Sequence, residues 1–306
     1  MTKNLRVKSS EYIDETNRIS FKFNGKTYHG FKGDTLASAL LANDVHLVGR
    51  SFKYHRPRGI MTSGSEEPNA IVQVNPGTNR TEPNVRATEV EIYEGLEASS
   101  QNCWPSVEFD IGGINNFLSP FFPAGFYYKT FMWPASFWEK YEFFIRHSAG
   151  LGKSPTSSDP DIYDHRNIHC DVLVVGAGLS GILAAKNAAK NNFKTLLVDE
   201  KNELGGSTIY ENNEFNKIDN KAPSEWLKKE IEELKNIKNL EIKTRTSVAA
   251  YHQYNYLLAR ENLTDHLEAK DKTNKIRQRL LKIRAKKVIL ATGALERPLI
   301  LSLIHI

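Results

Sequence analysis

The sequence DVLVVGAGLSGILAAKNAAKNNFKTLLVDEKNELGG, residues 171–206, decides the fold of the second half of this chain. Its apolar start, Asp171 to Val175, predicts a buried strand. A helix of small residues is expected from about Leu179 to Lys190, followed by a second strand from Thr195 to Val198. This order is typical of the βαβ unit that opens a dinucleotide-binding domain.

Three glycines between the first strand and the helix follow the G-x-G-x-x-G spacing. Gly176 permits the tight turn out of the strand, and Gly178 lets the backbone approach a pyrophosphate. Gly181 lets the helix pack closely against the strand. The helix N-terminus then offers free N–H groups and a partial positive charge to the phosphates.

An acidic residue just past the second strand extends the motif. Asp199 is expected to accept hydrogen bonds from both hydroxyls of an adenosine ribose, and its charge disfavours the 2′-phosphate of NADP. FAD and NAD are bound through the same motif, so the motif leaves the choice between them open.

The overall composition excludes several classes of protein. The chain has 306 residues and a net charge of +5, and its basic residues are dispersed, so no nucleic-acid surface is expected. The two cysteines, Cys103 and Cys170, suit a reducing compartment. Because the N-terminus has no apolar signal region and no run is long enough to cross a bilayer, a cytoplasmic protein without membrane attachment is expected.

The N-terminal segment predicts a small mixed domain. Residues 1–17 are polar and expected to be loose, and Ile19 to Phe23 alternates as a strand. Asn24-Gly25 indicates a tight hairpin turn, and Asp34 is expected to cap a following helix. Further strands are predicted at 71–74 and 90–93. This order indicates a β-grasp domain of ferredoxin type over residues 18–100, which makes the expected fold class α+β here and α/β in the following domain.

A segment rich in aromatic residues, 101–160, separates the two domains. Residues 117–144 hold thirteen Phe, Tyr and Trp residues, interrupted by prolines and charges. The segment is either a connector packed over the domain junction or a contact surface for another subunit, since aromatic residues are enriched at interface cores. Both interpretations stay open. The stretch from Gly150 to Asp161 is expected to be a linker.

The remaining pattern predicts an incomplete dinucleotide domain over residues 161–300. A helix is expected at 226–237, a third parallel strand at 240–244, and paired antiparallel strands at 248–259 and 280–286. The strand at 288–291 runs into Thr292-Gly293, which is typical of the return strand of a two-dinucleotide reductase. Residues 301–306 do not continue this Rossmann-type fold, and a truncated reading frame with a non-native tail is expected.

Several distinctive segments resemble the alpha subunits of bacterial heterotetrameric sarcosine oxidases. They are GDTLASALLANDVHLVGRSFKYHRPRGIMTSGSEEPNAIVQV (33–74), SQNCWPS (100–106), LSPFFPAGFYYKTFMWP (118–134), HCDVLVVGAGLSG (169–181) and VDEKNELGG (198–206). The resemblance covers about residues 19–300. It implies an oxidoreductase complex with beta, gamma and delta subunits, in which sarcosine is demethylated oxidatively to glycine. The products are formaldehyde or 5,10-methylenetetrahydrofolate, and hydrogen peroxide.

The resemblance also implies cofactors and contacts. NAD, with FAD as the alternative, is expected in this chain, and FAD and FMN in the partner subunit. The nucleotide contacts carried over by motif, together with the glycine turns, are Gly176, Gly178, Ser180, Gly181, Asp199, Glu200, Lys201, Gly206, Ser207, Val248, Thr292 and Gly293. No catalytic residue and no metal ligand is predicted.

An iron–sulfur cluster is not expected from the sequence. A [2Fe–2S] cluster requires about four cysteine thiolates, and residues 49–69, where cluster-bearing relatives place several, contain none. Two other functions stay open. The chain could be the alpha subunit of a related FAD-dependent amine or opine dehydrogenase, or a subunit that holds NAD for structure alone.

Overall fold

The computed structural model describes residues 5–6, 13–121, 133–148, 150–210, 217–272 and 274–294. The chain divides into two compact units between Pro160 and Asp161. The expected non-native tail, 301–306, and the central part of the aromatic segment, 122–132, lie outside the described residues.

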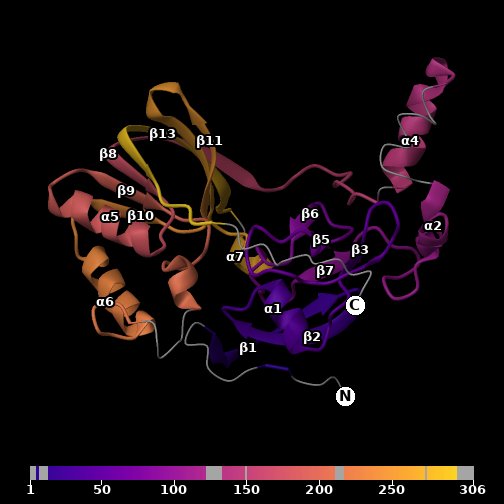
Figure 1. The fold of residues 1–306 in the computed structure, drawn as a ribbon, viewed down its shortest axis with the longest axis horizontal. Coiled ribbons are helices and arrows are strands. Elements are labelled where there is room, and N and C mark those ends of the chain that lie inside the picture. Colours follow the sequence, from indigo (N-terminus) through magenta and orange to yellow (C-terminus); the bar gives the residue numbers. More distant parts are fainter. Residues whose placement is uncertain are drawn as a thin grey trace. The chain divides into compact units, whose positions relative to one another are not determined.

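Unit 1 contains a five-stranded sheet in the order β2-β1-β7-β5-β6 (Figure 1). β1 is antiparallel to β2 and parallel to β7, and β5 pairs antiparallel with β6 and β7. β3 and β4 form a separate two-stranded ladder. The elements are β1 Asp14–Phe23, β2 Lys26–Lys32, α1 Leu36–Ala42, β3 Gly49–Arg50, β4 Pro57–Arg58, β5 Ile71–Val74, β6 Glu82–Arg86 and β7 Glu97–Ser100.

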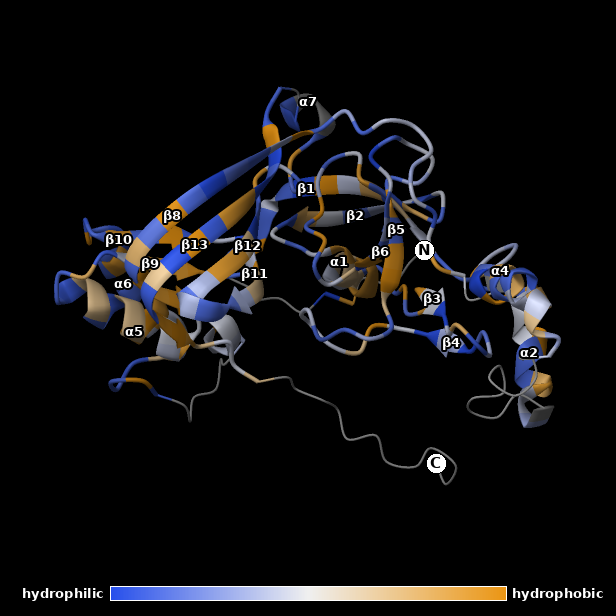
Figure 2. Ribbon diagram, turned by 90° about the horizontal axis from the view of Figure 1, so that it is seen from above, coloured by the Kyte–Doolittle hydropathy of each residue, from blue (hydrophilic) through white to orange (hydrophobic). Residues whose placement is uncertain are grey.

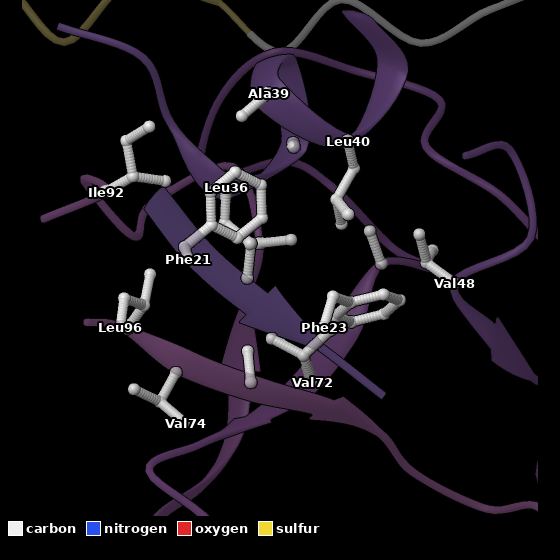
Figure 3. Packing of buried hydrophobic residues seen from close by; sticks show 14 of the residues in the cluster. Phe21, Phe23, Leu36, Ala39, Leu40, Val48, Val72, Val74, Ile92 and Leu96 are labelled. Atoms are coloured by element: carbon white, nitrogen blue, oxygen red, sulfur yellow. The ribbon is translucent and has the colours of Figure 1, made fainter. Parts of the chain in front are cut away.

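Helix α1 covers the apolar face of this sheet. Figure 3 shows Leu36 and Leu40 of the helix beside Phe21 and Phe23 of β1, all four fully or almost fully buried. These side chains alternate along the strand and repeat every four residues along the helix, so one face of each element is apolar. Their burial forms a core that belongs to unit 1.

The first half of unit 1 differs from the sequence expectation at two places. β1 begins at Asp14, so residues 14–17 are not loose: an irregularity between Asp14 and Arg18 lets the strand keep pairing with β2. The N-cap of α1 is Thr35 rather than Asp34. The Asp34 carboxylate is buried and accepts hydrogen bonds from Arg6 and from the backbone N–H of Phe31, which leaves the cap to its neighbour.

Two local predictions in unit 1 had opposite outcomes. The hairpin turn is confirmed, because Asn24 and Gly25 have φ values of 50° and 76°, as a type I′ turn requires. The expected strand at 90–93 is wrong. Ile92 and Tyr93 are buried against the core, but this stretch forms only an isolated bridge between Thr35 and Glu91.

Short helices follow β7 in the aromatic segment. They are η1 Ile111–Gly113, α2 Ile114–Phe117, η2 Ser119–Phe121, η3 Ala135–Phe137 and α4 Trp138–Ser148. Many of their large apolar side chains are exposed, which is unusual outside binding surfaces.

Unit 2 contains a six-stranded sheet in the order β10-β9-β8-β13-β12-β11. β10, β9, β8 and β13 are parallel, whereas β12 and β11 continue the sheet antiparallel. The elements are β8 Ile162–Val175, α5 Leu179–Lys190, β9 Thr195–Val198, η4 Gly206–Ile209, α6 Pro223–Lys235, β10 Leu240–Lys243, β11 Thr246–His252, η5 Gln253–Asn255, β12 Tyr256–Asn262, α7 Ala269–Lys272 and β13 Ile276–Leu290.

Helices α5 and α6 pack on one face of this sheet (Figure 1). Val172 and Val174 of β8 face Ile182 of α5 and Trp226 of α6. On the other face, Leu173 and its neighbours form a second apolar cluster with β12 and β13. Figure 2 shows the consequence along β8, which is hydrophilic where it begins and apolar where it approaches α5.

The antiparallel part of unit 2 is built differently from the prediction. The expected single strand at 248–259 is a hairpin of β11 and β12, because Tyr254 and Asn255 adopt positive φ and turn the chain. The expected strands at 280–286 and 288–291 are one strand, β13, which pairs with β12 on one side and β8 on the other. No helix among the described residues is long and apolar enough to cross a membrane.

Candidate dinucleotide site

The turn after β8 requires glycine at two positions. Gly176 has φ of +96°, and a Cβ added there would lie 2.3 Å from the carbonyl oxygen of Ala291 at the end of β13. A Cβ on Gly181 would lie 1.9 Å from the carbonyl oxygen of Gly176. Both positions therefore require glycine for the strand, the turn and α5 to pack as they do.

A second pair of glycines faces this turn. Gly205 has φ of +131°, and its N–H donates to the carbonyl oxygen of Ala177 at 2.8 Å. Gly206 has φ of +56°, and a Cβ added there would lie 2.9 Å from Cα of Gly178. The two glycine-containing loops thus lie directly against each other at the start of α5.

The N-terminus of α5 has no side-chain cap. Gly178 is the N-cap residue and provides no side-chain hydrogen bond, so the first N–H groups of the helix have no capping acceptor. An anion is stabilised at such a terminus by the N–H groups and by the helix dipole.

Asp199 connects the end of β9 to the glycine turn. Its carboxylate accepts hydrogen bonds from the N–H groups of Ala177 at 2.6 Å and Lys201 at 2.8 Å. Burial raises the pKa of this half-buried carboxyl above its usual value, although both N–H bonds oppose the shift. Each carboxylate oxygen can accept a second hydrogen bond, so the two contacts leave acceptor capacity for a ribose.

The other candidate residues lie in different surroundings. Ser180 and Ser207 are exposed, one in the first turn of α5 and the other in η4. The ammonium of Lys201 lies 5.2 Å from the ring centroid of Tyr210, and Glu200 is exposed. Val248 is half-buried against the cluster beside β12.

The last two candidates, Thr292 and Gly293, follow β13. Cα of Thr292 would lie 3.2 Å from a Cβ on Gly176, so the chain after the return strand passes close to the turn. Gly293 has φ of +68°, and both residues are exposed.

Sequence reasoning missed two residues that build the site. The N–H of Ala177 donates a hydrogen bond to the Asp199 carboxylate, and the carbonyl of Ala177 accepts one from the N–H of Gly205. Thr246, at the start of β11, donates its N–H to the Asp199 carbonyl at 2.7 Å. The Gly205-Gly206 pair was the available signal, but nothing in the spacing showed which backbone groups it contacts.

Two family models match separate parts of the chain. Residues 16–103 match a 2Fe-2S iron-sulfur cluster binding domain, and residues 171–286 match an FAD dependent oxidoreductase. The chain is therefore a mixed α/β protein with a ferredoxin-like domain followed by an FAD-oxidoreductase domain.

These matches correct the cofactor expectation. The expected absence of an iron–sulfur cluster is contradicted by the match of residues 16–103, and NAD as the first choice yields to the FAD-type match. The expectation relied on a cysteine count, whereas the match reflects the pattern of the whole domain. Residues 16–103 supply one cysteine, Cys103, whereas a [2Fe–2S] cluster takes four thiolates, so the side chains of this segment do not fit a cluster by themselves.

Comparison with individual proteins extends over almost the whole chain. Sarcosine oxidase subunit alpha of Rhizobium meliloti (strain 1021) is 49% identical over 296 residues, which cover 96% of this chain and 30% of that protein. The subunit of the same name from Corynebacterium sp. (strain U-96) is 32% identical over 94% of this chain and 25% of its own length. The chain thus spans less than a third of these relatives.

A solved structure shares the fold. L-proline dehydrogenase from P. horikoshii superposes with a TM-score of 0.55 at 19% identity, covering 92% of this chain and 42% of that one. Over nearly all of its length, this chain is similar in sequence to sarcosine oxidase subunits alpha.

Proposed function

We propose that this chain is the dinucleotide-binding part of the alpha subunit of a multi-subunit flavin oxidoreductase that acts on CH–NH donors. In this proposal unit 2 is a Rossmann-type domain of the two-dinucleotide-reductase kind, and unit 1 is a β-grasp domain. The pyrophosphate of FAD lies at the uncapped N-terminus of α5, and Asp199 accepts hydrogen bonds from the adenosine ribose. The support is the joint placement of the glycine turn, the helix terminus and the carboxylate.

The proposed substrate of the assembled complex is sarcosine. Its oxidation by oxygen and water gives glycine, formaldehyde and hydrogen peroxide, and with tetrahydrofolate the one-carbon unit leaves as 5,10-methylenetetrahydrofolate. The flavin supplies the redox chemistry, whereas the residues of this chain bind and orient the nucleotide. The support is the identity of 49% to a sarcosine oxidase alpha subunit.

The backbone conformation and the open space at Gly178 are the main support for nucleotide binding. Its backbone has φ of −70° and ψ of −174°, which any residue adopts, and a Cβ there would meet only Cα of Gly206 at 3.9 Å, an ordinary contact. The fold itself therefore does not require glycine at this position. A ligand that approaches the backbone closely does require it.

The proposal is tested with Gly178→Ala in the complete polypeptide, purified with its partner subunits. We expect the midpoint of thermal unfolding without nucleotide to stay within a few degrees. We expect bound nucleotide, released by acid and identified by absorbance and mass spectrometry, to fall about tenfold or more, as for a contact worth over 1.4 kcal/mol.

Gly181→Ala is the matched control, because its Cβ collides with the Gly176 carbonyl and lowers stability even without nucleotide. Wild-type nucleotide content in Gly178→Ala would refute the proposed site. Release of a nucleotide other than FAD would refute the flavin assignment while keeping the site.

A further inference from the structure

We infer that an exposed aromatic face of unit 1 docks another protein subunit, one whose apolar patch is bordered by aspartate and glutamate. The face consists of residues 104–118 together with the adjoining loop 51–56. The inference deepens the proposed function and rests on it, since it concerns how the subunit is assembled into its complex.

The face presents large apolar side chains to solvent. Phe109 is 70% exposed and Phe117 is 83% exposed. Four further members are also exposed: Trp104, Ile111, Ile114 and Leu118. Clusters of this kind, rimmed by polar residues, mark interaction sites on soluble proteins.

A buried carboxylate fixes the backbone beneath these side chains. Asp110 accepts hydrogen bonds from the N–H groups of Trp104 and Gly112, both at 3.1 Å. Its second oxygen lies 2.7 Å from Nδ1 of His55, and both side chains of this pair are almost fully buried. A Cβ on Gly112 would lie 2.3 Å from the same imidazole, so glycine is required there.

Arg50 also fixes this segment. The Arg50 guanidinium donates to the carbonyl of Val107 at 2.6 and 2.8 Å and to that of Glu108 at 3.1 Å. It also donates to the carbonyl of His55 at 3.2 Å. These polar groups fix the backbone from which the exposed apolar side chains project. Such a preorganised surface loses little entropy on binding.

The loop 51–56 beside the aromatic residues is positively charged, whereas residues 104–118 carry one exposed carboxylate, Glu108. Arg56 is exposed, and its Nε donates to the side-chain oxygen of Asn116 at 2.7 Å, so it lies next to α2. The side-chain amide of Asn115 donates to the Lys53 carbonyl at 3.4 Å, which ties the same loop to α2. The guanidinium of Arg56 and the ammonium of Lys53 each lie about 5 Å from the ring centroid of Tyr54. A partner with carboxylates at its rim complements this charge.

The positive charges of Lys53 and Arg56 also bear on which kind of partner binds this face. In a two-fold dimer formed through this face, Lys53 and Arg56 would lie near their own equivalents, which electrostatics disfavours. A membrane surface favours an amphipathic helix with a large apolar side, whereas α2 has four residues. The relatives are named as subunits, which favours a protein partner.

The test is site-specific photocrosslinking in the assembled complex. Phe117→p-benzoylphenylalanine places a photoreactive aromatic group on the face, in the complete polypeptide co-expressed with its beta, gamma and delta subunits. Tyr254→p-benzoylphenylalanine is the matched control, because Tyr254 is an equally exposed aromatic residue in unit 2. We expect a crosslink from position 117 to a different subunit, at a peptide that contains Asp or Glu beside apolar residues.

A second arm tests the charge. Arg56→Glu is expected to weaken subunit association about tenfold at low salt and less at high salt, while Arg18→Glu, an exposed arginine on β1, leaves association unchanged. The inference would be overturned if position 117 gave no crosslink, or crosslinked to another copy of this chain or to a later part of the same polypeptide. It would also be overturned if position 254 crosslinked equally well. So would loss of binding to phosphatidylserine vesicles by Arg56→Glu with unchanged subunit association.

Failure of this inference is distinguishable from failure of the proposed function. If no other subunit copurifies with the unsubstituted polypeptide, the proposed subunit role itself is wrong. If the complex forms with normal nucleotide content and the crosslink is absent, only the docking face is wrong.

Discussion

Single carboxylates organise backbone amides in both units. In unit 2, Asp199 joins the end of β9 to the glycine turn through the N–H groups of Ala177 and Lys201. Burial raises the pKa of its carboxyl, so the folded state binds a proton there more readily than the unfolded chain does. This group therefore favours folding below its unfolded pKa and costs stability as pH rises through its folded pKa. A half-buried carboxylate kept at such a cost is typical of a functional site.

Asp199→Ala is expected to weaken nucleotide binding by about 1–3 kcal/mol, because a charge-assisted hydrogen bond to the ribose is lost. The measurement is a titration of the nucleotide-free complex with FAD, followed by flavin fluorescence. Asp171→Ala is the matched control, since this carboxylate also accepts a hydrogen bond from a backbone N–H, that of Lys194, but lies beside the start of β9 rather than its end. Equal affinity of wild type and Asp199→Ala would contradict the assigned role.

Glu67 performs the corresponding task in unit 1. Its buried carboxylate accepts hydrogen bonds from the N–H groups of Met61, Thr62 and Asn69 at 2.7–2.8 Å, and of Ala70 at 3.2 Å. Burial raises the pKa of this carboxyl, but the backbone N–H groups together lower it below its usual value. A lowered folded pKa means that stabilisation is present above pH 4.5 and is lost as pH falls through the folded pKa.

Glu67→Gln is expected to lower the free energy of unfolding of unit 1 by about 1–3 kcal/mol at neutral pH, because a charged acceptor of four amides becomes a neutral one. The difference from wild type should shrink as pH is lowered below 4.5, where protonation removes the same charge. Urea unfolding followed by circular dichroism at several pH values measures both effects. Glu66→Gln, the neighbouring carboxyl, is the control, and a difference independent of pH would contradict this account.

Helices α5 and α6 are joined by an ion pair that is almost buried. Nζ of Lys186 lies 2.6 Å from a carboxylate oxygen of Glu230 and 2.7 Å from one of Glu233. Burial lowers the pKa of Lys186, but the hydrogen bonds from both carboxylates raise it overall. The stabilisation is therefore complete at neutral pH and is lost only as pH rises through the folded pKa, above 10.5.

Lys186→Met is expected to destabilise unit 2 by about 3 kcal/mol, because it leaves the Glu230 carboxylate buried without its cation. The double substitution Lys186→Met/Glu230→Leu should recover most of that loss, since neither charge then remains buried. Lys190→Met, which removes an exposed cation 3.7 Å from Glu233, should cost under about 1 kcal/mol. Thermal unfolding of the four proteins measures the series, and an additive double mutant would contradict it.

Among the helices and strands, those whose apolar pattern comes from a single buried face were predicted correctly from the sequence. The helix Leu179–Lys190 and the strand Thr195–Val198 were predicted with the observed bounds, because glycines and charged residues mark their ends. The predicted strand at 90–93 is wrong because Ile92 and Tyr93 are buried by packing into the core of unit 1, without a strand ladder. β13 was divided in two because its partners differ on its two sides, which a sequence pattern does not record.

The candidate site was predictable to a similar extent. Gly176, Gly181 and Asp199 were singled out because their chemistry depends on local spacing. The contacts of Gly205 and Thr246 were not, because they depend on how loops distant in sequence meet at one sheet edge. Asp34 was wrongly predicted as the N-cap of α1 for the same reason, since its hydrogen-bond partner Arg6 lies 28 residues away in the sequence.

The whole chain consists of two units, each with its own apolar core. The residues proposed to bind the nucleotide all belong to unit 2, whereas the proposed docking face belongs to unit 1. Nucleotide binding and subunit docking are therefore expected to be separable by substitution. A variant that loses the nucleotide should keep the fold of unit 1.

This separation predicts how the protein responds to its ligand. FAD at 100 times its dissociation constant should add about 2.7 kcal/mol to the free energy of unfolding of the unit that binds it. Hydrogen exchange resolved by mass spectrometry is the measurement, comparing peptides that cover α5 and β9 in unit 2 with peptides that cover β5 and β7 in unit 1. We expect slower exchange with FAD in the first set only, because the proposed ligand contacts are confined to the glycine loops and Asp199. Equal slowing in both sets would show that the two units open together, and slowing in unit 1 alone would place the ligand elsewhere.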